Sequence, residues 1–367
     1  MHLFVDSQEL NLGILSVIKA LPVRSAMPIL DGIYFEADSS GLHLKCSDLM
    51  LQKECSIPAT IEEEGVAIIP GKLFSEIVRK MPEGSIEFVL NGKTLNLSCG
   101  RAKSSIQCIE YEAFPEMRFS GETFKLTMDA KELHSMIMET VFATSLDESK
   151  PILTGALVEI SDMLRIVATD SYQFALRQTV LNNGPQSRDV IIPGKSLLEV
   201  ARMMEEEADE DAELIFTSTH VKVMRRNSVM VARLLDGDYI KYRQIIPSSY
   251  KTRVLVNRLE LMESIDRAQL MAREGNNNIV MSFKNGQLHI SAMSNSGNMD
   301  ESVDCTIMGE DIDIAFNPKY CMNILKCIED ETIYMDFLTN ISPAVIRPVS
   351  GENYYYLIVP VRIYSQY

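Results

Sequence analysis

Three segments with helical periodicity organise the hydrophobic pattern of the chain. Apolar residues recur every three to four positions over 7–21, 130–144 and 257–272, which is the spacing of one buried helix face. Ser7 is expected to cap the first helix, and Pro22 is expected to end it. The predicted inward positions are Leu10, Leu12, Ile14, Leu15, Val17, Ile18 and Leu21, then Leu133, Met136, Ile137, Thr140 and Val141, and finally Leu259, Leu261, Met262, Ile265 and Leu270.

Strand-like sequence follows each of these helices. Apolar residues alternate at 42–46, 164–168 and 288–292, as they do in a strand with one buried face. Segments 84–100, 212–233 and 331–348 each predict consecutive short strands. The order helix, strands, helix, strands indicates an α+β fold with antiparallel sheets. Hairpin turns are predicted at Ser39-Ser40-Gly41, Asn91-Gly92 and Asn285-Gly286.

A nearly verbatim repeat divides the chain. Ala-Ile-Ile-Pro-Gly-Lys at 67–72 returns as Val-Ile-Ile-Pro-Gly-Lys at 190–195, and each copy precedes a helical pattern. A third unit has Ile-Ala-Phe-Asn-Pro-Lys at the corresponding place, 314–319. A period of about 123 residues is too long for a solenoid and indicates duplicated whole domains. We therefore expect three similar domains, at 1–120, 125–249 and 251–367.

The composition is that of a globular protein. Hydrophobic residues make up 46% of the 367 residues, enough for each domain to bury a core. No apolar run is long enough to cross a bilayer and no signal pattern begins the chain, so a soluble, cytoplasmic protein is expected. The seven cysteines are odd in number and lack C-x-x-C spacing, which indicates neither a disulfide framework nor a zinc site. We expect no metal and no cofactor.

Gly194-Lys195-Ser196 suggests a phosphate-binding loop, which would make the protein a nucleotide-dependent enzyme. That motif requires a glycine five residues earlier, where this copy has Asp189 and the first copy has Val66. The five histidines are scattered, and no nucleophile elbow or dinucleotide fingerprint appears. We therefore expect a protein that is not an enzyme, in which Pro-Gly-Lys is a turn between a strand and a helix.

The charge argues against a DNA-binding protein of the usual kind. A formal net charge of −16 disfavours a basic patch that neutralises phosphates. The acidic run 205–211 is interpreted as a solvated loop. By contrast, the six predicted helices (those above and 71–81, 194–205 and 317–328) are together close to neutral.

Six motifs in this order resemble those of the bacterial sliding clamp family, the β subunit of the replicative DNA polymerase, and the resemblance covers the whole chain. The motifs are Arg24-x-x-x-Pro28-Ile29-Leu30, Val167-Ala168-Thr169-Asp170, Ile191-Ile192-Pro193-Gly194-Lys195, Tyr242-Arg243-x-Ile245-Ile246-Pro247, Ala315-Phe316-Asn317 and Val359-Pro360-Val361-Arg362. The resemblance implies two three-domain subunits joined head to tail, with antiparallel sheets outside and helices lining a central hole. Such a ring is a non-catalytic processivity factor that encircles duplex DNA and tethers polymerase, clamp loader and repair proteins. A peptide-binding multidomain adaptor that does not encircle DNA is the alternative.

The resemblance changes the meaning of the charge distribution. An acidic exterior with a near-neutral inner wall suits sliding, because strong phosphate pairing would hold the ring in place. The implied DNA-binding residues are Arg24, Lys72, Lys195 and Arg202. For each of them, an ordinary solvated charge on a helix face is the alternative.

The resemblance also implies a peptide-binding pocket between the second and third domains, completed by the C-terminal segment. Apolar side chains would anchor a peptide and a few polar groups would orient it. Core packing is the alternative for the apolar members. Ser171-Tyr172-Gln173, Ile240 and Gln244 depart from the usual family residues, so the peptide preference stays open. The matching positions are Leu153, Thr169, Ser171, Tyr172, Phe174, Ile240, Gln244, Ile245, Leu357, Val359, Pro360, Val361 and Arg362.

The implied dimer joins the first domain of one subunit to the third domain of the other. Leu270 and Met271 match apolar helix positions of that joint, and Ile106 matches a facing strand position with Lys103 nearby. Ser104 stands where an aromatic residue is frequent, which weakens one apolar contact.

Overall fold

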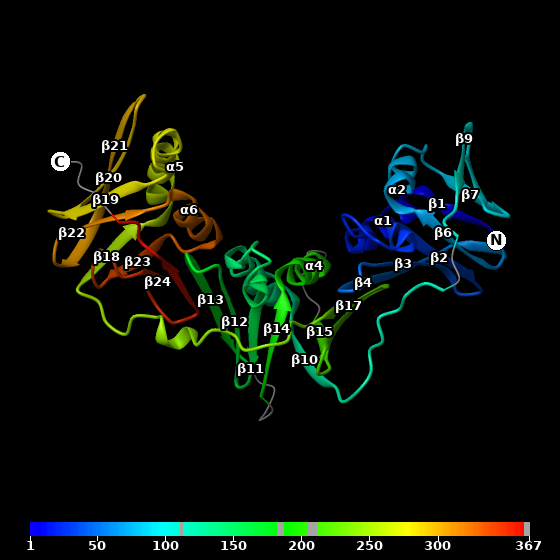
Figure 1. Ribbon diagram of the computed structural model, residues 1–367, viewed down its shortest axis with the longest axis horizontal. Coiled ribbons are helices and arrows are strands. Elements are labelled where there is room, and N and C mark those ends of the chain that lie inside the picture. The colour runs from blue at the N-terminus through cyan, green and yellow to red at the C-terminus, as the bar shows by residue number, and fades with distance from the viewer. Residues whose placement is uncertain (111–112, 182–186, 205–210, 363–367) are drawn as a thin grey trace. The chain divides into compact units, whose positions relative to one another are not determined.

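The computed structural model describes residues 1–110, 113–181, 187–204 and 211–362 (Figure 1). The acidic run therefore lies outside the described residues, except for Asp211. Among these residues, the strands form antiparallel sheets of five, eight and twelve strands. The result is a three-domain α+β fold, as the hydrophobic pattern predicts.

The three domains share one order of elements, to which the first domain adds the strand β5. The first contains β1 (His2–Asp6), α1 (Ser7–Val17), β2 (Gly32–Asp38), β3 (Gly41–Ser47), β4 (Leu51–Ile57), β5 (Thr60–Glu63), β6 (Gly65–Pro70), α2 (Gly71–Arg79), β7 (Ser85–Asn91), β8 (Thr94–Cys99) and β9 (Ala102–Gln107). The second contains β10 (Phe124–Asp129), α3 (Ala130–Met138), β11 (Gly155–Ile160), β12 (Met163–Thr169), β13 (Gln173–Val180), β14 (Arg188–Pro193), α4 (Gly194–Met204), β15 (Asp211–Phe216), β16 (His220–Arg225) and β17 (Ser228–Arg233). The third contains β18 (Thr252–Asn257), α5 (Arg258–Glu274), β19 (Ile279–Lys284), β20 (Gln287–Ser294), β21 (Gly297–Gly309), β22 (Ile312–Phe316), α6 (Pro318–Cys327), β23 (Thr332–Phe337), β24 (Ala344–Pro348) and β25 (Tyr354–Ile358).

The chain forms two compact units, the first of which comprises Met1–Ala130 and Arg202–Leu234. Its sheets run in the orders β5-β1-β7-β8-β9 and β10-β15-β16-β17-β4-β3-β2-β6. Phe35 of β2, Phe74 of α2 and Phe88 of β7 are fully buried, with ring centroids 5.2 to 5.9 Å apart. This aromatic cluster ties α2 to both sheets.

The second compact unit comprises Lys131–Ala201 and Leu235–Tyr367. Its strands form one sheet in the order β14-β11-β12-β13-β25-β24-β23-β18-β21-β20-β19-β22. Strands β13 and β25 pair antiparallel, so strands of the second and third domains share this sheet (Figure 1). In the third domain, the rings of Phe283 and Phe337 pack with centroids 4.8 Å apart.

The first helix begins at a different cap from the one predicted. Asp6 is the cap, because its Oδ1 accepts hydrogen bonds from the backbone N–H groups of Gln8 (2.8 Å) and Glu9 (3.2 Å). Ser7 is the first helical residue, and its hydroxyl accepts the backbone N–H of Gly84 at 3.1 Å. Asp and Ser are both favourable cap residues, and the predicted cap, Ser7, is one residue after the observed cap.

The predicted strand repeats are confirmed. The alternating segments 42–46, 164–168 and 288–292 lie in β3, β12 and β20, and their apolar members are all buried. Because their inward residues alternate with more exposed ones in strands β3 and β20, one face of each of these strands supports the core.

Two of the predicted hairpin turns illustrate how glycine sets the loop. Asn285 and Gly286 form a two-residue turn with φ of 53° and 78°, as predicted. The other turn is shifted by one residue, because Asn91 pairs with Thr94 and belongs to the strand. Gly92, with φ of 61°, is therefore the first loop residue of that turn.

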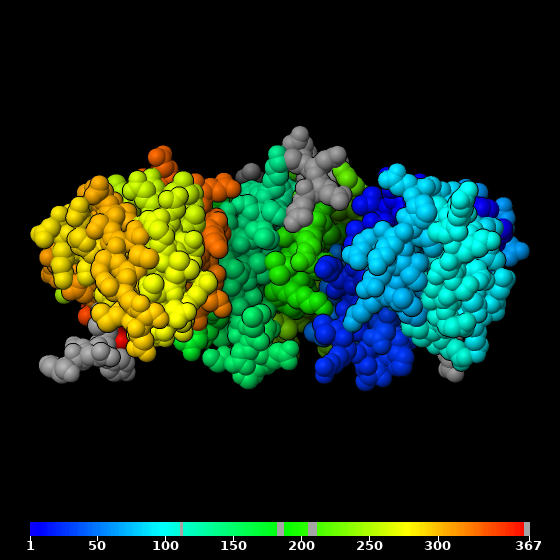
Figure 2. Space-filling model, turned by 90° about the horizontal axis from the view of Figure 1, so that it is seen from above, coloured from blue at the N-terminus to red at the C-terminus, as the bar shows by residue number. Residues whose placement is uncertain are grey.

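The predicted inward faces hold for the second helix and fail in part for the other two. The predicted inward residues of the 130–144 segment are all buried. In α1, Leu12 and Leu15 are 57% and 50% exposed, and in α5, Leu259 and Leu270 are 47% and 56% exposed. Helix α5 lies at the molecular surface, yellow in Figure 2. Both helices carry apolar residues beyond the face that the domain covers, so periodicity alone overestimates burial.

We expect Gly309→Ala to destabilise the third domain by about 3 kcal/mol or more. Gly309 has φ of 125°, and a Cβ there would lie 2.0 Å from the carbonyl oxygen of Lys251. Gly286→Ala is the matched control, because Gly286 has φ of 78° but open space around its Cβ position; it should cost about 1 kcal/mol. Calorimetric unfolding checks both, and equal losses would contradict the role of the close approach.

Candidate functional site

The pairing of β13 with β25 forms the base of the candidate site. Phe174 and Leu357 are directly opposite each other across this pair. Both are buried, at 2% and 3% exposure, in a cluster with Leu157, Val167, Leu176, Ile191, Tyr242 and Val345. Phe174 and Leu357 therefore belong to the core beneath the site, as the core-packing alternative predicts.

A tight turn between β12 and β13 forms one wall. The Oδ1 of Asp170 accepts the backbone N–H groups of Tyr172 (2.8 Å) and Gln173 (2.9 Å), while the Thr169 hydroxyl donates to the carbonyl of Gln173 (2.7 Å). Ser171 has φ of 80°, a left-handed conformation that the capped turn holds in place. The turn therefore presents the side chains of Ser171 and Tyr172 to solvent.

The C-terminal segment forms a second wall beside this turn. The N–H of Val359 donates to the carbonyl of Tyr172 at 2.9 Å, and the N–H of Val361 donates to the carbonyl of Ala315 at 2.8 Å. Val359 is 40% exposed, Pro360 and Val361 are half-buried, and Arg362 is exposed. Backbone pairing thus holds this segment between the second and third domains.

Two residues that sequence analysis did not select complete this region. The ring of Tyr172 stacks on that of Tyr320 from α6, with centroids 5.8 Å apart and planes 6° apart. Burial, followed by the nearby Asp170 carboxylate, raises the pKa of Tyr320. Behind the turn, the buried side chain of Gln173 accepts a hydrogen bond from Asn323 of α6 at 3.2 Å. Neither contact has a sequence signal, because the residues are 148 positions apart in the first and 150 in the second.

The segment between the second and third domains (residues 234–251, the linking segment) forms the third wall. Ile240 and Ile245 are 38% and 44% exposed, and Gln244 is exposed at the end of the short helix Tyr242–Gln244. The ring of Tyr242 stacks on Phe174, with centroids 5.9 Å apart. This stacking brings the segment over the buried base of the site.

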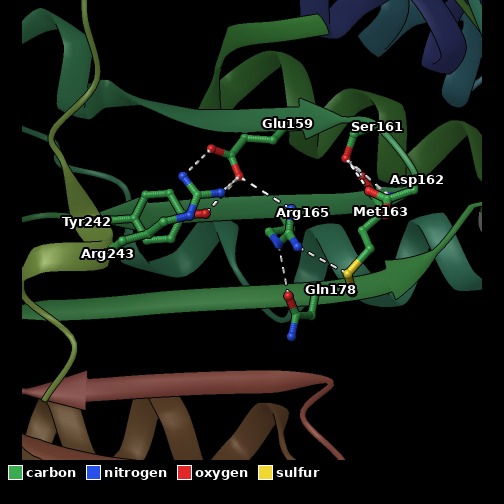
Figure 3. A network of polar contacts seen from close by, with 8 residues as sticks. All are labelled: Glu159, Ser161, Asp162, Met163, Arg165, Gln178, Tyr242 and Arg243. Atoms are coloured by element: carbon green, nitrogen blue, oxygen red, sulfur yellow. Dashed lines mark hydrogen bonds and ion pairs between the residues drawn. The ribbon is translucent and has the colours of Figure 1, made fainter. Parts of the chain in front are cut away.

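A polar network anchors that segment to the sheet (Figure 3). The Tyr242 hydroxyl donates to Oε2 of Glu159 at 2.7 Å, and the Arg243 guanidinium donates to both carboxylate oxygens at 3.0 and 2.7 Å. Burial and the hydrogen bond to Glu159 raise the pKa of Tyr242. The hydrogen bond to Glu159 likewise raises the pKa of Arg243. Tyr242 and Arg243 are protonated at neutral pH even at their ordinary pKa values, so both can donate there, and the upward shifts extend this protonation to higher pH.

The remaining predicted pocket residues, Leu153 and Thr169, belong to the second domain. Leu153 is half-buried in the short helix Pro151–Thr154, and its carbonyl accepts the N–H of Ser145 at 2.7 Å. Thr169 is buried at the end of β12. The set thus divides into a buried base and exposed or half-buried rims on the turn, the linking segment and the C-terminal segment.

Three of the predicted DNA-binding residues, Lys72, Lys195 and Arg202, lie on helices, and Arg24 lies in the loop that follows the first helix. Arg24 and Lys72 line one surface hollow of about 610 Å³ in the first domain, together with Leu21, Pro22, Val23, Ser25, Asp31, Pro70, Gly71 and Leu73. The ammonium of Lys72 donates to the carbonyl of Val23 at 3.4 Å. Lys195 and Arg202 lie two turns apart on α4, and therefore on the same side of that helix.

The predicted dimer residues differ in accessibility. Lys103 is exposed on β9 and Leu270 is exposed on α5, whereas Met271 is half-buried. Ile106 is only 4% exposed, inside the first domain. Within a single chain, Lys103 and Leu270 are therefore the most accessible of the four predicted dimer residues.

The Pro-Gly-Lys motif is a strand-to-helix joint. Strand β14 ends at Pro193 and α4 begins at Gly194. A Cβ on Gly194 would lie 2.7 Å from the Thr144 hydroxyl and 3.2 Å from the carbonyl of Thr154. The glycine therefore allows close packing of the helix start, as the turn prediction requires.

No helix of the described residues is long and apolar enough to cross a membrane. Over the same ranges, no group of three or more His, Cys, Asp or Glu side chains has a geometry that could hold a metal ion. The seven cysteines are all free thiols, and burial raises the pKa of several of them, including Cys46 and Cys321.

Comparisons with known proteins agree with the resemblance seen in the motifs. The N-terminal, central and C-terminal domain models of the DNA polymerase III beta subunit match residues 1–118, 127–241 and 243–362. The beta sliding clamp of Bacillus subtilis (strain 168) is 33% identical and aligns with 99% of this chain and 100% of its own length. Among solved structures, a putative DNA polymerase III beta subunit from Eubacterium rectale has a TM-score of 0.93 at 32% identity, and the beta subunit from Thermotoga maritima has 0.91 at 28%. Each of these two covers 99% of this chain and is itself covered completely. The chain therefore belongs to the DNA polymerase III beta subunit family, the family of the beta sliding clamps, which are non-catalytic processivity factors.

Proposed function

We propose that two copies of this chain close into a ring around duplex DNA and tether the replicative polymerase, the clamp loader and repair proteins. The observation that carries this proposal is a joint in which the last strand of one domain pairs with a strand of another domain. The joint occurs twice within the chain. A third pair of corresponding strands keeps unpaired edges among the described residues. The proposal places the protein in the cytoplasm, where bacterial DNA is replicated.

The two internal joints share backbone geometry. In the first, β17 pairs with β4, and the N–H of Arg233 donates to the carbonyl of Met50 at 2.8 Å. In the second, β25 pairs with β13, and the N–H of Val359 donates to the carbonyl of Tyr172 at 2.9 Å. In both joints, a turn capped by an aspartate side chain precedes one of the paired strands, β4 or β13. Each turn contains a residue in the left-handed conformation, Leu49 before β4 and Ser171 before β13. The joint is therefore a repeated unit of construction.

Strand β9 corresponds to β17 and β25, and the first half of β21 corresponds to β4 and β13. Among the described residues, β9 pairs only with β8, and Gly297–Asp304 of β21 pairs only with β20. Unpaired strand edges are ready to pair with another chain. We infer that β9 of one subunit pairs with β21 of the other, which would close a head-to-tail ring.

The charges of these two edges are complementary. Strand β9 carries the exposed Lys103 and follows the exposed Arg101, whereas β21 carries Asp300, Glu301 and Asp304. Opposite charges across an interface favour the correct partner and register. Exposed Leu270, on the neighbouring helix α5, would supply apolar area to the same joint.

DNA would be held loosely inside the ring. Arg24, Lys72, Lys195 and Arg202 offer backbone contacts on helices or beside helix starts, while the chain as a whole carries −16. Few phosphate contacts mean weak equilibrium binding, so retention on DNA would be topological. Partner proteins would dock short peptides over the base formed by Phe174 and Leu357.

Topological retention has a direct test. After loading onto nicked circular DNA, the protein should stay bound in salt on the order of 0.5 M, which screens phosphate contacts. Linearising that DNA should release the protein within the time of sliding to an end. Gel filtration of labelled protein and DNA measures both states. Continued retention on linear DNA would contradict a sliding ring.

The ring joint predicts an asymmetry between two leucines of one helix. Leu270→Asp should weaken dimerisation by about a hundredfold or more, because it buries a charge in the joint. Leu259→Asp, at a comparably exposed position at the start of α5 (47% against 56% for Leu270), should leave the dimer intact. Light scattering over a micromolar dilution series measures both. A wild-type chain that is only monomeric would favour the adaptor alternative, and a dimeric Leu270→Asp variant would refute this joint.

The division of the pocket into base and rim predicts separable effects. Val359→Ala and Ile245→Ala should each weaken binding of a labelled peptide with adjacent Leu and Phe side chains by roughly tenfold. Their unfolding free energies should change little, because both residues are partly exposed. Phe174→Ala should instead cost about 3–5 kcal/mol of stability. Fluorescence anisotropy and denaturant unfolding report the two properties, and unchanged peptide affinity in both rim variants would remove the pocket assignment.

A further inference from the structure

We propose that Glu159 is a positioning residue of the peptide site, holding the segment between the second and third domains so that its apolar side chains face the docked peptide. This inference rests on the proposed peptide-binding function. Glu159 lies on β11 and accepts hydrogen bonds from Tyr242 and Arg243, so it would act on the rim through these two residues (Figure 3).

The carboxylate of Glu159 has a chemical reason to hold this segment. Glu159 is only 7% exposed, and a buried carboxylate must be paired and hydrogen-bonded to be tolerated. Tyr242 and Arg243 together supply three hydrogen bonds of 2.7 to 3.0 Å, two of them from one guanidinium. Bidentate pairing fixes direction as well as distance, so the two adjacent residues are held in one orientation.

The orientation of Tyr242 sets the path of the residues around it. Its N–H donates to the carbonyl of Ile240 at 2.7 Å, and its carbonyl accepts the N–H of Ile245 at 3.0 Å. Its ring lies on Phe174 at the buried base. The hydroxyl bond to Glu159 therefore fixes a short compact turn whose two flanking isoleucines stay partly exposed on the rim.

The same network reaches the strand that precedes the C-terminal wall. Arg165 lies 3.9 Å from Glu159 and donates from Nε to the side-chain oxygen of Gln178 at 3.0 Å. Gln178 in turn donates to the carbonyls of Glu352 and Asn353, just before β25. The network thus extends from Glu159 to the residues just before β25, and the strongest contacts of Glu159 are with the linking segment.

The first domain offers an internal comparison at the corresponding position. Glu36 of β2 accepts a hydrogen bond from Tyr34 of the same strand, at 3.3 Å. There the segment between domains is held differently, by Lys45 to Glu116 at 2.8 Å and by Gln52 to the N–H of Met117 at 3.0 Å. In the first domain the tyrosine that donates to this glutamate belongs to the same strand, whereas in the second domain the donors Tyr242 and Arg243 belong to the linking segment itself.

The test uses the full-length protein and a fluorescent peptide with adjacent Leu and Phe side chains. Glu159→Gln should weaken peptide binding by about tenfold, and Arg243→Gln should do the same. Because both act through one pair, the double variant should bind as either single variant does. Hydrogen exchange of the 240–246 amides should quicken in all three, while the melting temperature of the third domain stays unchanged. Glu36→Gln is the matched control and should bind peptide as the wild type does.

The outcomes separate this inference from the function on which it rests. A wild-type chain that binds no peptide, or whose peptide affinity is unchanged in both Val359→Ala and Ile245→Ala, would refute the peptide site itself. Wild-type peptide affinity in both Glu159→Gln and Arg243→Gln would overturn only the positioning role. Additive losses in the double variant, or losses that follow the melting temperature, would assign Glu159 to general stability instead. If Glu159→Gln fails to fold, Arg243→Gln still decides, because that arginine side chain is 62% exposed.

Discussion

The structure depends on the requirement that strand edges be paired. A strand at the end of a sheet leaves a row of N–H and C=O groups without partners, which invites pairing with another chain. Within this chain, two such edges are paired with a strand of another domain. Strand β4 pairs with β17, and β13 pairs with β25. Each pairing joins one domain to the next, so the domain boundaries are continuous sheets. The same rule accounts for why β9 and the first half of β21 are suited to a second copy.

The helices depend on these sheets in turn. Each of the first two domains turns from a strand into its second helix at Pro-Gly-Lys, where the glycine permits contact closer than any side chain would allow. Because that close approach sets where each helix begins, Lys72 and Lys195 take equivalent places one residue into their helices. A charge repeated by a structural motif can contact a repeated backbone without recognising sequence. The overall charge of −16 is compatible with this arrangement, since it is carried mainly outside the helices.

Local pattern predicted the fold well, and long-range contacts limited the prediction of the site. Strand alternation at 42–46 and the duplicated Pro-Gly-Lys turn depend on neighbouring residues only, so periodicity and turn chemistry identified them. Whether Phe174 is base or rim depends on Tyr242 and Leu357, which lie far away in sequence. The same holds for Glu159, which is an ordinary strand carboxylate until the segment between domains folds over it. Helical spacing placed Leu270 on the buried face, although it is 56% exposed, because spacing within one chain does not reveal which apolar residues another subunit would cover; only the resemblance pointed to the dimer joint.

The two internal junctions show how one backbone joint can serve different roles. Both have the capped turn, the left-handed residue and the hydrogen bond from the incoming strand. They differ in side chains: the second junction places Val359 where the first has Arg233, and Tyr172 where the first has Met50. Tyr172 stacks on Tyr320, and Glu159 anchors the segment opposite. Because rigid aromatic and anchored apolar groups lose little entropy when a ligand binds, the second junction would be the better prepared of the two for the proposed peptide. Duplication would thus supply the frame of the site, and substitution at a few side chains would make one copy a binding surface.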